Sequence, residues 1–150
     1  MRKLITFILC FCFANFINAQ KLDLNLIDKL VKMSFVSMDE YMVEGYGFEK
    51  LENKSDERTS TYARKYNNDY NSTIIIKVLN PKDTPNVIEI FLAKNFNIRD
   101  VKDELLSRGY EYNGSNKYGG IVYKKRKSVY VISKEPNEVG ATQIMVLTEW

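Results

Sequence analysis

The sequence contains no histidine and only two cysteines, Cys10 and Cys12. Without histidine the chain cannot form a Ser-His-Asp triad, a histidine general base or a His-ligated zinc site. Both cysteines lie in a leader that we expect to be removed, so the mature chain would have no thiolate nucleophile, iron–sulfur cluster or disulfide. The sequence also lacks a P-loop and a Gly-x-Gly-x-x-Gly turn between a strand and a helix. We therefore expect neither a cofactor nor a metal site.

Residues 1–19 have the pattern of a secretory signal peptide. Arg2 and Lys3 give a basic start, an apolar core follows, and Ala19 places a small residue before the expected cleavage site at Gln20. An N-terminal membrane anchor is the alternative, although the apolar run is short for a membrane span. We expect export to the periplasm or the extracellular space, and a mature chain, residues 20–150, that folds as a single domain.

Positive and negative charges nearly balance. The chain has 22 Lys and Arg residues and 19 Asp and Glu residues, a formal net charge of +3. Removal of Arg2 and Lys3 with the leader leaves 20 basic residues against 19 acidic ones. This balance is not the electrostatic footprint of a protein that binds nucleic acid. The mature chain also has no apolar run long enough to cross a membrane, so we expect no transmembrane segment in it.

Apolar residues follow helical spacing in some segments and alternate in others. Leu26, Leu30 and Met33 mark a first helix, and Asn97 and Gly109 are typical of the start and the end of another. The expected helices lie at 22–33, 37–45 and 97–109, and the expected strands lie at 59–66, 74–79, 87–93, 110–113, 121–124, 128–133 and 142–148. Short turns between consecutive strands favour antiparallel pairing. We predict an α+β fold, with an antiparallel sheet of about seven or eight strands and helices on one face.

The segment 74–79 is the most apolar of the expected strands. Ile74, Ile75 and Ile76 follow one another without a polar residue between them, and β-branched residues are enriched in strands. An uninterrupted apolar run is typical of a strand that is covered on both sides. We therefore expect a central strand that is buried on both faces.

The two halves of the mature chain have a similar order of elements. Each half contains a helix, a glycine followed by an aromatic residue (Gly47-Phe48 and Gly109-Tyr110), and a run of strands. We predict internal repeats at about 22–94 and 95–150. The pattern resembles the tandem helix-plus-strands units of the β-lactamase-inhibitor protein fold, and it resembles small secreted proteins of unassigned role from Bacteroidetes-type bacteria. The resemblance implies one sheet built from two such units.

The ten tyrosines all lie in the mature region, and several fall on expected strands. Tyr110 and Tyr112 alternate with Glu111, which places both rings on one face of their strand. Together with Tyr123 and Tyr130, they are our candidate binding residues on an open sheet face, because tyrosine combines apolar area with a polar tip. The alternative is that the rings pack across neighbouring strands and stabilise the sheet.

A basic cluster, Lys124, Lys125, Arg126 and Lys127, lies between two expected strands. One interpretation is an anion contact, with a phosphate-bearing glycan, lipopolysaccharide or an acidic partner. The other is a solvated hairpin tip whose charges discourage pairing with other chains. The sequence leaves both interpretations open.

Paired carboxylates could support glycoside hydrolysis, and the chain has three adjacent pairs. They are Asp39-Glu40, Asp56-Glu57 and Asp103-Glu104. Neighbouring side chains on a helix point apart, and acidic residues in the first turn of a helix stabilise its dipole. We therefore expect these pairs to have structural roles and identify no catalytic residue.

These observations predict an exported, non-catalytic binding protein whose partner is a protein or an envelope glycan. The first alternative is a weak hydrolase of the cell envelope that uses carboxylates or a Ser/Lys pair, and such an enzyme needs a carboxyl group with a raised pKa. The second alternative is a structural envelope component. It is suggested by Trp150 after the expected strand that ends at Thr148, because this order resembles the aromatic ending of outer-membrane barrels.

Overall fold

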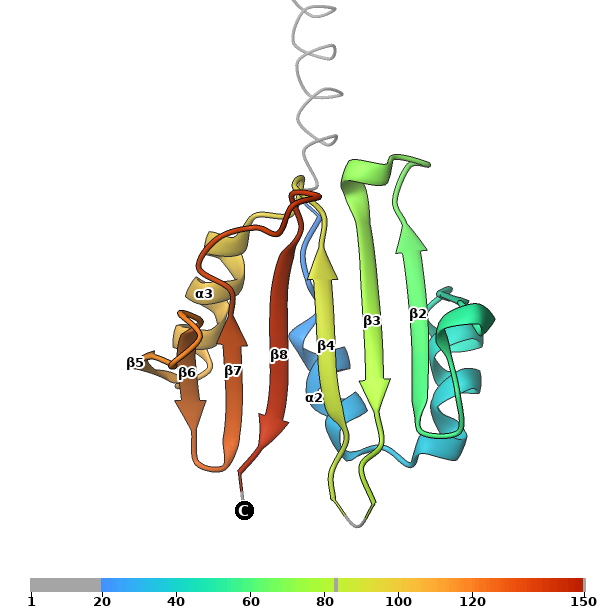
Figure 1. Ribbon diagram of the computed structural model, residues 1–150, viewed down its shortest axis with the longest axis horizontal. Helices are drawn as coiled ribbons and strands as arrows, with labels where there is room; N and C mark the ends of the chain where they lie inside the picture. The colour runs from blue at the N-terminus through green and yellow to red at the C-terminus, as the bar shows by residue number, and fades with distance from the viewer. Residues whose placement is uncertain (1–19, 83, 150) are drawn as a thin grey trace, which may run out of the picture.

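An eight-stranded antiparallel sheet forms the body of the protein, and helices lie along one side of it (Figure 1). The computed structural model describes residues 20–82 and 84–149. The predicted signal peptide and Trp150 lie outside the described residues. The predicted fold class, α+β with one antiparallel sheet and helices on one face, is confirmed.

The elements follow one another in a simple order. The helical segments are α2 (Leu24–Lys32), η1 (Phe35–Ser37), η2 (Glu40–Gly45), η3 (Glu52–Lys54), η4 (Tyr70–Ser72) and α3 (Ile98–Ser107). The strands are β1 (Glu49–Lys50), β2 (Thr59–Lys65), β3 (Thr73–Leu79), β4 (Val87–Leu92), β5 (Glu111–Ser115), β6 (Ile121–Lys125), β7 (Ser128–Ile132) and β8 (Thr142–Thr148). The segment predicted as a helix at 37–45 is helical, but the 3-10 turn η1 ends at its first residue, Ser37, and its larger part, Glu40–Gly45, is the π-helix η2.

The strand order across the sheet is β1-β2-β3-β4-β8-β7-β6-β5. Strands β1 to β4 are neighbours in chain order, and so are β5 to β8. The two sets meet where β4 pairs with β8, with Ile90 opposite Ile144. Every pairing in the sheet is antiparallel. Short connections favour this direction for the consecutive strands, and the β4–β8 pairing, between strands far apart in the chain, has it as well.

Alternation along the central strands divides the sheet into a covered face and an uncovered one. In β3, Ile74, Ile76 and Val78 are buried, whereas Ile75 and Lys77 between them are only half-buried. Successive side chains of a strand point to opposite faces, so the buried side chains are those on the face that the helices cover. The prediction that this strand is buried on both faces is wrong, because the helices α2 and α3 lie behind the sheet and neither of them covers the front of β3 (Figure 1).

The two longer helices have the sequence signals that the fold requires. The Asp23 side chain caps α2 by accepting hydrogen bonds from the backbone N–H groups of Asn25 (2.9 Å) and Leu26 (3.3 Å). The predicted cap of α3 is confirmed, since Asn97 Oδ1 accepts from Arg99 N at 3.1 Å. The chain leaves α3 through Gly109, whose φ of +79° is the left-handed conformation that glycine adopts without strain.

Asn86, just before β4, ties the end of α2 to the sheet. Its side chain is buried, and Nδ2 donates to the carbonyl oxygens of Leu30 and Met33, both at 2.8 Å. Its backbone N–H donates to the Val31 carbonyl at 3.1 Å. One residue thus satisfies carbonyl groups that the last turn of a helix leaves without intrahelical partners.

Replacement of Asn86 by alanine should lower the free energy of unfolding by about 2–3 kcal/mol, because two carbonyl groups lose a buried donor. Urea denaturation followed by far-ultraviolet circular dichroism measures the effect. Asn53→Ala is the matched control, since Asn53 is exposed in η3, and it should change the free energy by less than about 0.5 kcal/mol. Equal stabilities of the two variants would show that Asn86 does not hold α2.

Candidate functional site

Three of the four tyrosines predicted to bind a partner lie in the core. Tyr130 is fully buried, and Tyr110 and Tyr123 are each 6% exposed. Tyr130 is paired with the buried Val146 on one side and with Tyr123 on the other, so its row of side chains lies beneath the helices. The prediction that these rings line the open face of the sheet is wrong. Tyr112 continues the same row at the edge of the sheet and is 62% exposed.

The buried tyrosines join the sheet to the helices. Tyr130 Oη donates to Asp28 Oδ1 in α2 at 2.8 Å, and the Tyr110 ring meets the Tyr130 ring edge-on with centroids 5.2 Å apart. Tyr110 Oη and Ser128 Oγ share a hydrogen bond of 2.9 Å. Burial raises the pKa of Tyr130, and the negative charge of Asp28 raises this pKa further. These rings therefore pack the interior, which was the alternative interpretation of the tyrosine pattern.

The face opposite the helices, hereafter the open face, carries mainly apolar side chains. The larger ones on its central strands are Ile75, Leu79, Val87, Phe91, Val131, Met145 and Leu147. All seven are half-buried. The strand register aligns them in rows, and Phe91 lies between Ile75 and Gln143 in one of these. The charged residues at its centre, Lys77 and Glu89, lie opposite each other and form an ion pair, with Lys77 Nζ 3.4 Å from Glu89 Oε2.

The open face is hollowed over β7 and β8. A cavity of about 560 Å³ is lined by Val131, Met145 and Leu147, with residues 116–120 of the β5–β6 turn along one side. Tyr118 in that turn is 82% exposed. An apolar floor with a polar, aromatic rim is the usual composition of a binding site. We call this cavity the β7–β8 hollow.

Two residues of the β5–β6 turn shape the wall of the β7–β8 hollow. Asn116 Oδ1 accepts from the backbone N–H groups of Tyr118 (3.0 Å) and Gly120 (2.8 Å), which fixes the turn. A Cβ on Gly120 would lie 2.7 Å from Val131 Cγ1. Glycine at this position thus lets the turn approach the sheet. The sequence contained turn signals here, but they did not indicate that the turn folds against β7.

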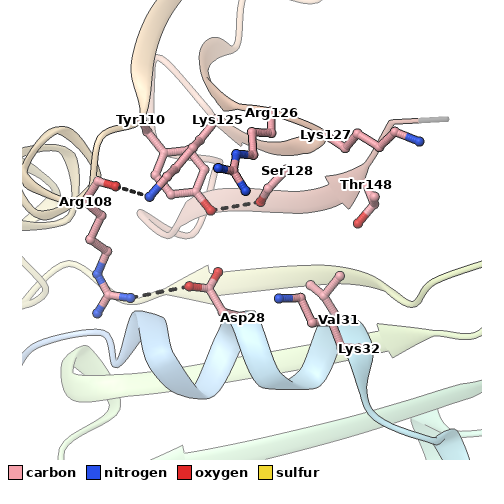
Figure 2. Close-up of a pocket in the computed structure, with 10 residues that line it drawn as sticks. All are labelled: Asp28, Val31, Lys32, Arg108, Tyr110, Lys125, Arg126, Lys127, Ser128 and Thr148. Atoms are coloured by element: carbon pink, nitrogen blue, oxygen red, sulfur yellow. Dashed lines mark hydrogen bonds and ion pairs between the residues drawn. The ribbon is translucent and has the colours of Figure 1, made fainter.

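The predicted basic cluster lies at the β6–β7 turn, and its members have different surroundings. Lys124 forms an ion pair with Glu149, and Lys125 Nζ donates to the Arg108 carbonyl at 2.5 Å. Arg126 and Lys127 line a second cavity, of about 600 Å³, on the helix side of the sheet (Figure 2). The ionisable residues of this basic cavity are Asp28, Lys32, Arg108, Lys125, Arg126 and Lys127.

The candidate hydrolytic carboxylates make separate structural contacts. Asp39 accepts from Tyr62 Oη at 2.6 Å and from Lys50 Nζ at 2.8 Å. Glu104 pairs with Lys21 Nζ at 2.9 Å and accepts from Arg108 Nε at 3.0 Å. Asp39 and Glu104 therefore each have positively charged partners, and the two carboxylates do not share one.

The pKa values of these two carboxyl groups are lowered. Partial burial alone would raise the pKa of Asp39, but hydrogen bonds from Lys50 and Tyr62 outweigh it and lower the pKa. Burial likewise opposes the hydrogen bonds from Lys21 and Arg108 that lower the pKa of Glu104. A carboxyl group that acts as a general acid needs a raised pKa, so neither residue has the property that the hydrolase alternative requires.

Within residues 20–82 and 84–149, no three His, Cys, Asp or Glu side chains are grouped as metal ligands. In the same residues, no helix has the length and apolar character needed to cross a membrane.

Comparison with known proteins gives no match: no protein-family model, no curated protein and no solved structure is similar to this chain. The open face and the two cavities are therefore the features of the described residues that bear on function.

Substitution of two tyrosines should distinguish packing from surface roles. Tyr130→Ser should lower the free energy of unfolding by about 3–5 kcal/mol, because it leaves a large buried space and removes the partner of Asp28. Tyr112→Ser, at an exposed position of the same row, should cost less than about 1 kcal/mol. Urea denaturation at neutral pH measures both values. A Tyr130→Ser variant as stable as Tyr112→Ser would contradict the placement of Tyr130 in the core.

Glu104 should contribute to stability at neutral pH and lose this contribution in acid. Because folding lowers its pKa from an ordinary value of 4.5, the contribution is complete above that pH and disappears as the pH falls through the lower pKa of the folded state. Glu104→Gln should reduce the free energy of unfolding by about 1 kcal/mol at pH 7. The variant should also lose less stability than the wild type between about pH 5 and pH 3. Parallel pH curves for the two proteins would contradict this role.

Proposed function

We propose that the chain is an exported, non-catalytic binding protein that holds a protein partner against the open face of its sheet. The observation that carries the proposal is the apolar, uncovered face with the β7–β8 hollow in it. Monomeric proteins rarely leave a large contiguous apolar surface in water unless another molecule covers it. Binding on this face differs from the tyrosine-based site that the sequence suggested, although the kind of function is the same.

The chemistry of the open face favours a protein over an envelope glycan. Phe91, Val131 and Met145 offer apolar contact, and the nearby Lys77–Glu89 pair is already satisfied. A glycan would bring many hydroxyl groups to a surface with few free hydrogen-bond partners, and desolvation of those groups would be costly. A protein segment with an apolar side chain fits better, since the hollow of about 560 Å³ accepts such a group while the rim at Tyr118 makes polar and aromatic contacts.

Export and internal duplication belong to the same proposal. Support for duplication comes from the order of elements, a helix followed by a four-stranded run in each half, and from the pairing of β4 with β8 between these runs. A duplicated sheet of this kind is twice as wide as either half, which gives a partner a broad surface. Export would place that surface outside the cytosol, where the partner would also lie.

The experiment compares capture by wild-type protein with capture by an open-face variant. In Phe91→Lys/Met145→Lys, two positive charges enter the apolar surface on either side of the β4–β8 pairing. The variant should retain at least about tenfold less of the partner that the wild type captures from the cell-envelope fraction. The reason is that burying an unpaired lysine costs more than about 1.4 kcal/mol. Quantitative mass spectrometry of the bound fraction measures the loss.

The matched control is Val36→Lys/Val139→Lys. It introduces the same two charges at apolar side chains that are 92% and 85% exposed and do not line the β7–β8 hollow. The control should retain the same amount of partner as the wild type does. Val131→Thr serves as a milder variant, since it keeps the size and β-branching of valine but adds a hydroxyl to the floor of the hollow. Equal retention by wild type, control and both open-face variants would show that the open face does not bind.

A further inference from the structure

The basic cavity gathers positive charge from three parts of the chain. Lys32 comes from the last turn of α2, Arg108 follows α3, and Lys125, Arg126 and Lys127 come from the β6–β7 turn. Figure 2 shows the α2 residues on one side of the space and the residues of the β6–β7 turn on the other. The cavity therefore lies between elements that are far apart in sequence, on the side of the sheet opposite the open face.

The charge in this cavity is strongly unbalanced. Its lining has five cationic side chains and one carboxylate, a net of four positive charges. That carboxylate, Asp28, already accepts from Tyr130 Oη at 2.8 Å and lies 3.4 Å from Arg108 Nη1. Within residues 20–82 and 84–149, Lys32, Arg126 and Lys127 form no ion pair. Their charges are thus available to an anion.

Arg126 occupies a backbone position that does not suit arginine. Its φ is +54°, a left-handed conformation that costs a residue with a Cβ roughly 1–2 kcal/mol and that glycine or asparagine adopts more easily. Residues 126–127 are the two-residue turn between Lys125 and Ser128, where such a conformation favours glycine or asparagine. The sequence therefore has an arginine at the cavity although the backbone conformation at this position favours glycine or asparagine.

We propose that the basic cavity binds a ligand that carries phosphate groups. A phosphate group has several oxygen acceptors and more than one negative charge, and a planar guanidinium such as that of Arg126 pairs with it through two parallel hydrogen bonds. The Ser128 and Thr148 hydroxyls, which also line the cavity, supply neutral donors. A volume of about 600 Å³ accommodates a group with two phosphates and part of the molecule attached to it.

Binding of inorganic pyrophosphate to the mature protein, followed by amide chemical shifts in nuclear magnetic resonance spectra, tests this site. We expect the shifts to concentrate in residues 28–32, 108–110 and 125–128. The variant Lys32→Gln/Arg126→Asn should bind at least about tenfold more weakly, which corresponds to the loss of one charge-assisted hydrogen bond. Because asparagine suits the left-handed position, this variant should remain folded and at least as stable as the wild type.

Lys54→Gln/Lys82→Gln is the matched control, since it removes two positive charges from exposed positions outside the cavity. It should leave pyrophosphate binding unchanged. Shifts scattered over the surface, no shifts at millimolar pyrophosphate, or equal weakening in the control would overturn the proposal. Phe91→Lys/Met145→Lys should keep pyrophosphate binding, so failure of the open-face proposal and failure of this one can be told apart.

A second arm identifies the source of the phosphate groups. Vesicles of phosphatidylcholine, with and without phosphatidylglycerol, are sedimented with the wild-type protein. If the protein binds the anionic vesicles and pyrophosphate releases it from them, the ligand is a lipid headgroup. Binding of pyrophosphate without vesicle binding would identify a soluble phosphate-bearing molecule. Both results support a phosphate site, whereas vesicle binding that Lys32→Gln/Arg126→Asn does not weaken would contradict it.

Discussion

Two short helices can cover only one face of an eight-stranded sheet, and most features of this molecule depend on that constraint. Helices of 9 and 10 residues are roughly 14–15 Å long. Eight strands about 4.8 Å apart form a sheet more than about 30 Å wide. The helices, with the short turns between them, therefore cover one face alone. The apolar side chains that alternate onto the other face have no cover within the described chain, and a binding partner would provide one.

The helices are held to the sheet by pairs of a tyrosine and a carboxylate. Tyr62 Oη donates to Asp39 at 2.6 Å, and Tyr130 Oη donates to Asp28 at 2.8 Å. A tyrosine in such a pair buries its ring in the core and places its hydroxyl where a partly exposed carboxylate can accept the hydrogen bond. Burial raises the pKa of both phenols, so both stay protonated as donors. The interior of this fold thus accounts for Tyr62, Tyr110, Tyr123 and Tyr130, whereas Tyr118 is exposed at the rim of the β7–β8 hollow.

Much of the fold could be predicted because its signals are local. The cap at Asn97, the exit at Gly109 and the bounds of the last strand, 142–148, all depend on residues close in sequence. Alternation also showed which side chains share a face of each strand. It could not show which face the helices cover, and this is why the tyrosines were assigned to the wrong side. Ile75 was expected to be buried for another reason, because an uninterrupted apolar run is also typical of a strand covered on both faces.

The candidate surfaces were harder to predict, because each combines distant segments. The β7–β8 hollow forms only because the turn at 116–120 folds against Val131 of β7 and so makes a wall beside Met145 and Leu147. The basic cavity forms only because the end of α2 lies opposite the β6–β7 turn. The sequence identified the basic turn itself, but not Lys32 and Arg108 as its neighbours. Phe91 and Met145 could have been found from alternation, had the covered face been known.

A nearly neutral chain can still have a strongly basic cavity, because charges act locally. Screening in physiological salt limits electrostatic interactions to about 8 Å, so the net charge of +3 says little about any one site. The ion pairs remove acidic groups elsewhere: Glu89 is paired with Lys77 and Glu149 with Lys124. Asp28, the one carboxylate of the basic cavity, is held by Arg108 and Tyr130. An anion that enters this cavity therefore meets Lys32, Arg126 and Lys127 without a competing carboxylate, and it is this local arrangement that favours its binding.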